Sequence, residues 1–542
     1  MELQSKTARY ATTAIEGSSP PSDGVSEDGI HPMKNNSGRH GHLHTIGGGS
    51  AANRSLGPVD KLDRYLSSKP IISFGLTLQA SWEAVALSFQ STLLNGGPST
   101  LVYGAILSSV GSTAMAATLG EMASMQPCVG AQYRWTALLA PRGSNPRFWG
   151  YLQGWLTTFA WNAACALNPF LMGSMIQGCI ILCNETYVPQ GWHTTLLAYA
   201  SMALPIFCNI YARRLIAPLE IASAVLHVLL LIVFVVVLVC MARRSTSDFV
   251  FNTSFYGISG WKNEGIQWSI GLLAVIFPIG GYDAILHMAD EVKDAKRKVP
   301  QAMVGSTMLS SVVMFIFIIV LLFCIGDIDA VSGSLTGLPI IEVLYEATGS
   351  KAGTVFLVMC IYFIIGASQF NILASVSRLA WAFAKDGGLP FSAQLSRVHP
   401  TLRIPINAVA LTSTICLLIN LIPVGSTTAF YALTSLSTLA LYVSYCVPAT
   451  LILLRKLENN FPAYGPWKIA GPYWVGLGVN MFAFGWGWYC VFSLCLPTFM
   501  PVTAATLNWA GPILAAVIVI AVTQWFVSGS KNFVVPKDEL DE

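Results

Sequence analysis

Five ionisable side chains lie inside otherwise apolar stretches of the sequence, where charged groups are rare. They are the acids Glu83, Glu220 and Asp283 and the imidazoles His227 and His287. A charged side chain at the centre of a membrane costs roughly 2.5–3.5 kcal/mol on insertion scales, so an ionisable residue there is a functional candidate by default. These residues therefore indicate a polar site inside a bilayer.

Two of the acids lie where the apolar pattern is weakened. Residues 78–85 read LQASWEAV, and residues 276–283 read IFPIGGYD, in which a proline and two glycines precede the acid. Proline and glycine destabilise a helix, and backbone groups freed inside a membrane are tolerated only beside protein or water. Interrupted helices at matching positions in two halves of a chain are typical of an inverted-repeat transporter with its site between them. The alternative is two buried kinks that bind no ligand.

Twelve apolar stretches must position these residues, and each can cross a hydrocarbon core, which takes about 20 helical residues. They cover approximately residues 71–93, 98–121, 148–182, 193–211, 216–241, 267–290, 304–326, 352–382, 406–423, 427–454, 473–496 and 507–529. Since each interrupted stretch opens a block of five, we expect an all-α polytopic membrane protein with repeats over residues 71–241 and 267–454. Residues 473–529 would add two helices. The polar residues 1–70 predict a disordered tail, and residues 530–542 predict a short C-terminal tail.

The composition excludes most soluble proteins. Of 542 residues, 54% are hydrophobic and 11% are charged, whereas a soluble domain carries about 25% charged residues. Membrane lipid is therefore the expected surrounding, and a net charge of +3 does not suggest a nucleic-acid partner. The cysteines fall mostly in apolar stretches and are interpreted as small buried hydrophobes, although Cys179 and Cys183 could form a redox pair. We expect neither a metal nor a cofactor.

Basic residues orient the bundle. Loops that follow even-numbered stretches hold fifteen Lys and Arg residues, and loops that follow odd-numbered stretches hold four. Since positively charged loops stay in the cytosol, we expect both termini there, in a protein of the plasma membrane. The acceptor motifs at Asn184 and Asn252 then face outward, where N-glycosylation is possible.

Four regions of the sequence resemble the amino acid–polyamine–organocation superfamily, and within it the fungal branch of GABA, choline and amino-acid permeases. They are residues 283–302 (DAILHMADEVKDAKRKVPQA), 95–98 (NGGP), 120–123 (GEMA) with 130–133 (GAQY), and 377–380 (SRLA) with 385–390 (KDGGLP). The resemblance implies a LeuT-like fold, with ten core helices in two inverted five-helix repeats and two peripheral helices. It also implies alternating access and a substrate site at the interruptions of the first and sixth spans.

By position, the resemblance places the first interruption at Trp82, Glu83 and Ala84. The family commonly has small residues here, whose amides receive a substrate carboxylate. Glu83 departs from that pattern, because it would repel a carboxylate 4 Å away by about 4 kcal/mol at an effective dielectric constant near 20. Either Glu83 is protonated or turned aside, or the substrate presents a cation here.

The second interruption is implied to run from Phe277, at the place of an aromatic gate, through Gly280 and Gly281 to Tyr282. Its carbonyl groups would meet an ammonium group. The rings of Phe277, Tyr282 and Trp82 could add cation–π contacts of roughly 0.5–2 kcal/mol each, with plain packing as the alternative. Residues of the third, eighth and tenth spans are implied to line the site, namely Trp161, Asn162, Gln369, Asn371 and Ser435.

The resemblance also makes Asp283 the first candidate for coupling to protons, because it aligns with an acid implicated in the proton response of bacterial relatives. His287 lies one helical turn further on and could relay the proton or simply hydrogen-bond the acid. Glu83 is a further candidate for the same role.

The leading hypothesis is a proton-coupled importer of an amino acid or a related small amine, with GABA, choline and neutral amino acids as the main candidates. The alternative is a nutrient receptor that keeps the carrier fold without net transport. An enzyme is not expected, because the sequence has no HExxH motif, no nucleophile–base constellation and no nucleotide loop GxxxxGK[ST].

Overall fold

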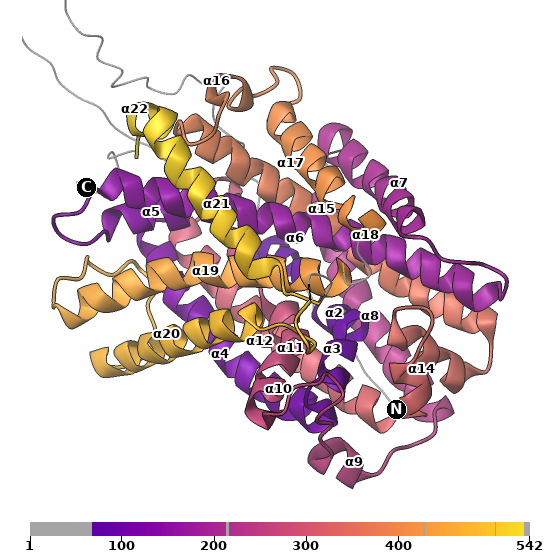
Figure 1. Ribbon diagram of the computed structural model, residues 1–542. Helices are drawn as coiled ribbons and strands as arrows, with labels where there is room; N and C mark the ends of the chain where they lie inside the picture. Colours follow the sequence, from indigo (N-terminus) through magenta and orange to yellow (C-terminus); the bar gives the residue numbers. More distant parts are fainter. Residues whose placement is uncertain (1–67, 213–215, 426–428, 504–505, 536–542) are drawn as a thin grey trace, which may run out of the picture. The chain divides into compact units, whose positions relative to one another are not determined.

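The computed structural model describes residues 68–212, 216–425, 429–503 and 506–535, and every element in these ranges is a helix (Figure 1). Residues 1–67, which make up nearly all of the predicted N-terminal tail, lie outside the described part, as do residues 536–542.

Eleven segments of the described chain are long and apolar enough to cross a membrane. They are α4 (Gly97–Met125), α6 (Pro146–Cys183), α7 (Gly191–Tyr211), α8 (Ile216–Met241), the segment Glu264–Glu291, α12 (Ala295–Phe323), α15 (Lys351–Lys385), the segment Ile406–Gly425, α19 (Ala429–Leu457), α20 (Tyr473–Cys495) and the segment Ala510–Asn532, which begins with α21 (Ala510–Gln524). The prediction of an all-α polytopic membrane protein is confirmed. The first of the twelve expected stretches is divided into α1 (Ser68–Gln79), α2 (Ser81–Ser88) and α3 (Gln90–Leu94), so it does not form one long helix.

Shorter helices connect these segments. They are α5 (Ala131–Leu138), α9 (Ser247–Asn252), α13 (Ile328–Ser332), α14 (Pro339–Thr348) and α16 (Ser392–Leu395). Polar side chains define where two long helices begin, because Asn145 accepts hydrogen bonds from the first backbone N–H groups of α6 and Ser350 does the same for α15.

The most buried helices lie at the centre of the bundle. Within the apolar windows of Glu264–Glu291, α19 and α6, 89%, 83% and 72% of the residues are buried, against 22% for the segment that begins with α21. In Figure 1, α15 and α19 lie on either side of α6, and both pack against it. Polar groups at membrane depth are tolerated only beside protein or water. Because protein surrounds the central helices, these helices can hold a polar site.

The first membrane segment is broken at Ala80, so the prediction that placed the interruption at Trp82, Glu83 and Ala84 is wrong, because these three residues lie inside α2. Ala80 has φ 41° and ψ 51°, in the left-handed region that residues other than glycine rarely adopt, and it separates α1 from α2. The carbonyl group of Leu78, freed near this point, accepts a hydrogen bond from Ser368 on α15 at 2.7 Å.

The segment Glu264–Glu291 is interrupted at the predicted Pro-Ile-Gly-Gly sequence. It runs through α10 (Glu264–Gly271), α11 (Leu273–Ile276) and the short turn η3 (Phe277–Ile279), and it resumes as the tighter helix η4 (Tyr282–Glu291). Gly281 has φ 79°, which only glycine adopts without strain. Gln79 at the end of α1 donates to the Gly280 carbonyl at 3.3 Å, so the two interruptions contact each other.

The first residues of the predicted C-terminal tail pack against the bundle. Phe533 is fully buried in an aromatic cluster with Tyr133, Tyr151, Phe383 and Trp525. Arg147 on α6 donates through its Nε to the Phe533 carbonyl at 3.0 Å. This end of the chain is therefore attached to α5 and α6.

Candidate functional site

A central cavity of about 50 Å³ lies between the two helix interruptions. Of the predicted site residues, five line it: Ala84, Trp161, Phe277, Gly280 and Gly281. Residues that the sequence did not single out complete the wall, among them Gln79, Ala80, Asn168, Ser368, Ser437, Thr438 and Tyr442. None of the lining side chains is charged, so backbone groups and neutral dipoles set the polarity of the cavity.

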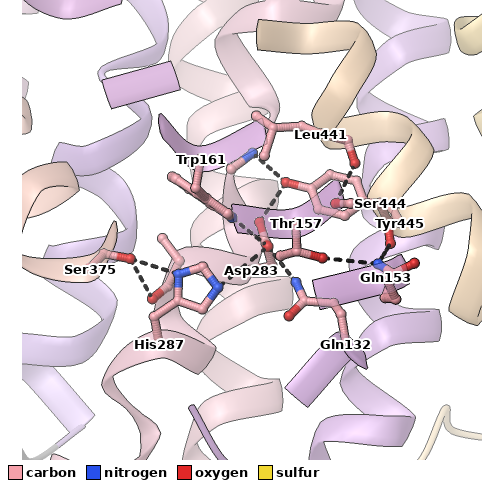
Figure 2. A network of polar contacts seen from close by, with 12 residues as sticks. Gln132, Gln153, Thr157, Trp161, Asp283, His287, Ser375, Leu441, Ser444 and Tyr445 are labelled. Atoms are coloured by element: carbon pink, nitrogen blue, oxygen red, sulfur yellow. Dashed lines mark hydrogen bonds and ion pairs between the residues drawn. The ribbon is translucent and has the colours of Figure 1, made fainter. Parts of the chain in front are cut away.

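Asp283 lies behind one wall of this cavity, in a fully buried polar network (Figure 2). Its Oδ2 accepts hydrogen bonds from Gln132 Nε2 at 2.5 Å and from Trp161 Nε1 at 2.9 Å, and its Oδ1 accepts one from the Tyr445 hydroxyl at 2.5 Å. Since Trp161 also lines the cavity, one indole ring separates the carboxyl group from the cavity space.

Tyr445 connects Asp283 to the second interruption. Its hydroxyl accepts a hydrogen bond from the Gly281 backbone N–H at 3.2 Å while donating to the acid. A change in the protonation of Asp283 would therefore act directly on the backbone that borders the cavity.

His287 is close to Asp283 but does not hydrogen-bond it. Its Nε2 lies 4.0 Å from Asp283 Oδ2 and has no hydrogen-bond partner among the described residues. Its Nδ1 pairs with the Ser375 hydroxyl at 2.9 Å, and its ring contacts Trp161 edge-on (Figure 2). The predicted pair is thus adjacent in space, with Ser375 fixing the histidine.

Glu83 and Trp82 are turned away from the cavity. Glu83 Oε1 lies 2.8 Å from His227 Nδ1 on α8, and both side chains are fully buried. Trp82 donates through its indole N–H to the His227 carbonyl at 3.2 Å and packs against Phe234 and Phe317. Two residues expected at the substrate therefore contact α8, whereas Ala84 faces the cavity.

The other predicted residues are dispersed around the centre. Tyr282 is buried behind the cavity and stacks on Tyr445, with ring centroids 5.0 Å apart. Asn162 donates to the Thr158 carbonyl one turn earlier in α6 at 2.7 Å, and Gln369 Nε2 lies 3.1 Å from the sulfur of Met202.

Two more predicted lining residues belong to other cavities. Asn371 borders a cavity beside Glu220, and Ser435 borders a small cavity formed with residues 498–499 and 506–508. Neither lies among the residues that line the central cavity.

The start of α2 borders the cavity. Ala80 precedes its first turn, lines the cavity and supplies no side-chain cap. The first N–H groups of a helix have no partner within it and carry a partial positive charge, so they attract anions. Glu83 itself belongs to this first turn, and its carboxyl group is directed to His227.

Sequence reasoning missed Gln132 and Tyr445, although both bind Asp283. Gln132 lies within the GAQY motif that carries the family resemblance, and Tyr445 lies within the tenth predicted span. Neither is unusual for its local sequence, and their roles arise from contacts across 151 and 162 residues.

Buried ion pairs stabilise the bundle away from the cavity. Lys456 on α19 contacts Glu121 on α4 at 2.6 Å, and Arg378 Nε on α15 donates to Glu291 at 2.5 Å. Near the C-terminal residues, Arg134 pairs with Asp386 at 3.0 Å.

The Tyr133 hydroxyl donates to the same Asp386 carboxylate at 2.6 Å. Burial, and then the nearby Asp386 charge, raise the pKa of Tyr133 well above its usual range. This hydroxyl therefore remains a donor at physiological pH.

Both predicted glycosylation sites are exposed. Asn184 follows the end of α6, and Asn252 is the last residue of α9.

Known proteins resemble the chain over nearly all of its membrane region. The family model described as amino acid permease matches residues 70–526. The choline transporter of Saccharomyces cerevisiae is 30% identical over 87% of this chain and 83% of its own length. The amino-acid permease 2 of Neurospora crassa is 26% identical over 90% and 89%, and the polyamine transporter TPO5 of Saccharomyces cerevisiae is 25% identical over 88% and 77%. These relatives are permeases and transporters and not enzymes. The chain belongs to the amino acid permease family, in the fungal branch of the amino acid–polyamine–organocation superfamily.

Proposed function

We propose that this permease is a proton-coupled carrier of a small zwitterion, such as an amino acid or GABA, that works by alternating access at the central cavity. The observation that carries the proposal is the orientation of Glu83. Its carboxyl group pairs with His227 and does not line the cavity, whereas Ala80, which precedes the first turn of α2 without a side-chain cap, does line it, so a substrate carboxylate would bind at this end of α2.

The ammonium group of such a substrate would meet the second interruption and the aromatic lining. Gly280 and Gly281 border the cavity, and the Phe277, Trp161 and Tyr442 rings line the same space. Backbone carbonyls and aromatic faces both attract a cation, and each cation–π contact is worth roughly 0.5–2 kcal/mol. The cavity wall thus supplies electron-rich groups for a cation.

Asp283 supplies the proton site in this proposal. It is the acid next to the cavity, and Trp161 and Tyr445 link it to the lining and to the second interruption. Protonation would remove the negative charge that these donors stabilise, which gives a route from proton binding to helix movement.

A second candidate substrate is a quaternary amine such as choline. Three aromatic rings around a cavity without charged side chains suit such a cation. One of the two relatives from Saccharomyces cerevisiae is a choline transporter, which supports testing this compound first among cations.

We also propose a plasma-membrane location with both termini in the cytosol, and inverted repeats over residues 71–241 and 267–454. The bias of fifteen to four basic loop residues supports the orientation.

Counterflow in proteoliposomes tests the substrate. Vesicles loaded with unlabelled GABA, leucine, choline or putrescine are mixed with the same labelled compound, with protein-free vesicles as the blank. We expect exchange of a zwitterion, with affinity changed less than about threefold by Glu83→Gln and by the matched exposed control Glu264→Gln. Removing one partner of a buried charge pair typically costs 2–5 kcal/mol, so a cation held by Glu83 would instead lose at least roughly thirtyfold in affinity. That loss, or stoichiometric binding without exchange, would overturn the proposal.

A further inference from the structure

A second cavity, of about 290 Å³, opens between α7, α8 and α15 and shares no lining residue with the central cavity. Its rim carries Leu204, Leu219 and Phe363, whose side chains are exposed by 61%, 44% and 64%. These three residues lie on helices that are apolar enough to cross a membrane. Exposed apolar side chains on such helices face lipid, so the mouth of this lateral cavity opens into the bilayer.

The wall of the lateral cavity contains a buried acid, Glu220 on α8. Its Oε2 accepts a hydrogen bond from Asn371 Nδ2 at 2.7 Å and lies 3.0 Å from the Thr77 hydroxyl on α1. The residue is 2% exposed, and no described basic side chain forms an ion pair with it. Arg213 and Arg214, which precede α8, lie outside the described residues.

Glu220 differs in this respect from the other buried glutamates of the bundle. Glu83 has His227, Glu121 has Lys456 and Glu291 has Arg378 within 2.8 Å. A carboxylate in an apolar wall is costly unless a cation pairs with it. The cavity therefore has the volume and the counter-charge for a cationic group that the described protein does not itself provide.

We propose that the lateral cavity is a binding site for a primary amine carried on an alkyl chain. The ammonium group pairs with Glu220, and the chain leaves through the rim between Leu204 and Phe363 into the bilayer. Asn209 uses its amide N–H groups on the Pro205 and Phe370 carbonyls, which leaves its own oxygen as a second acceptor in the cavity wall. An ammonium has three donors and no acceptor, so it matches this wall of acceptors.

The lateral cavity is connected to the central cavity through α1. Thr77, which contacts Glu220, lies on α1 three residues before Ala80, and Ala80 lines the central cavity. An occupant of the lateral cavity would therefore meet the helix that moves if the first interruption acts as a hinge.

Photolabelling of the full-length protein in phosphatidylcholine nanodiscs tests the proposal without relying on transport. The probe is a long-chain primary amine with a photoactivatable diazirine in its chain, and the matched control probe is the corresponding alcohol. Peptide mapping should find the amine on α7, α8 and α15 at least roughly tenfold above the alcohol. Excess unlabelled dodecylamine should compete, and dodecanol should not.

Two variants separate charge from shape. Glu220→Gln keeps an acceptor oxygen for Asn371 and should reduce amine labelling to the level of the alcohol, whereas Glu264→Gln should leave it unchanged. Leu204→Trp, which narrows the mouth, should reduce labelling by both probes, and it provides the decision if Glu220→Gln fails to fold. Equal labelling by amine and alcohol, labelling that maps to other helices, or full labelling of folded Glu220→Gln or Leu204→Trp would each overturn the proposal.

Discussion

The proposed coupling role of Asp283 makes a quantitative prediction for Asp283→Asn. The carboxyl group accepts three hydrogen bonds, from Gln132, Trp161 and Tyr445. Bonds to a charged acceptor contribute about 1.5–3 kcal/mol and bonds between neutral groups about 0.5–1.5 kcal/mol. Replacing the carboxylate with an amide weakens the bonds from Gln132 and Trp161 by about 1 kcal/mol each. The amide N–H₂ group cannot accept the third bond, from Tyr445, so about 1.5–3 kcal/mol is lost there, and the total of about 3.5–5 kcal/mol lies at or below the low end of the 5–15 kcal/mol that typically stabilises a domain. The variant should fold.

Transport should separate into two behaviours in this variant. A difference of one pH unit is worth about 1.4 kcal/mol per proton, so one-to-one coupling lets the wild type accumulate substrate about tenfold per pH unit. The asparagine cannot release or take up a proton, so accumulation should fall to the level set by the substrate gradient alone. Exchange at equal pH needs no proton movement and should be retained within about fivefold.

The assay uses proteoliposomes with an imposed pH difference, with accumulation and exchange measured on the same preparation. Glu264→Gln removes a carboxylate at an exposed position outside the proposed site, and it serves as the control. If Asp283→Asn accumulates substrate about tenfold per pH unit with an unchanged pH profile, Asp283 has no part in coupling.

Three further predictions concern stability and topology. Lys456→Met leaves Glu121 as a buried charge without its cation, so it should cost about 3–5 kcal/mol, seen as a lower midpoint of thermal unfolding; an unchanged midpoint would contradict this. Because the pKa of Tyr133 is raised by burial, the folded state keeps the proton that the unfolded state releases near pH 10, so stability falls as pH rises above that value. Tyr133→Phe should flatten this alkaline loss, and it should weaken the protein at neutral pH by about 1–3 kcal/mol through loss of the hydrogen bond to Asp386, which keeps its pair with Arg134. Unfolding curves at pH 7–11 would measure both effects. In sealed cells, an N-terminal tag should resist external protease and Asn184→Gln should remove a glycan-dependent gel shift; cleavage of the tag would refute the orientation.

The membrane segments and the position of the second interruption followed from local sequence. A run of about 20 apolar residues must be helical in lipid, because its backbone groups have no other partner there. The Pro-Ile-Gly-Gly sequence before Asp283 marks a place where a helix is weak, and the chain leaves the regular helix at Phe277 and continues from Tyr282 as the tighter helix η4. Hydropathy and helix propensity depend on residues that are neighbours along the chain, so both can be estimated from the sequence alone.

Tertiary structure decided which side of each helix meets the cavity. Successive helical residues differ in direction by about 100°, so Ala84 in the cavity wall means that Glu83 points elsewhere. The direction of the first turn of α2 depends on the left-handed backbone at Ala80, and an alanine in a sequence does not indicate this conformation. His227 then receives Glu83 from 144 residues away, and Gln132 receives Asp283 from 151 residues away. Such pairs depend on how distant helices pack, because a buried polar atom takes whichever partner the packing brings within hydrogen-bond distance.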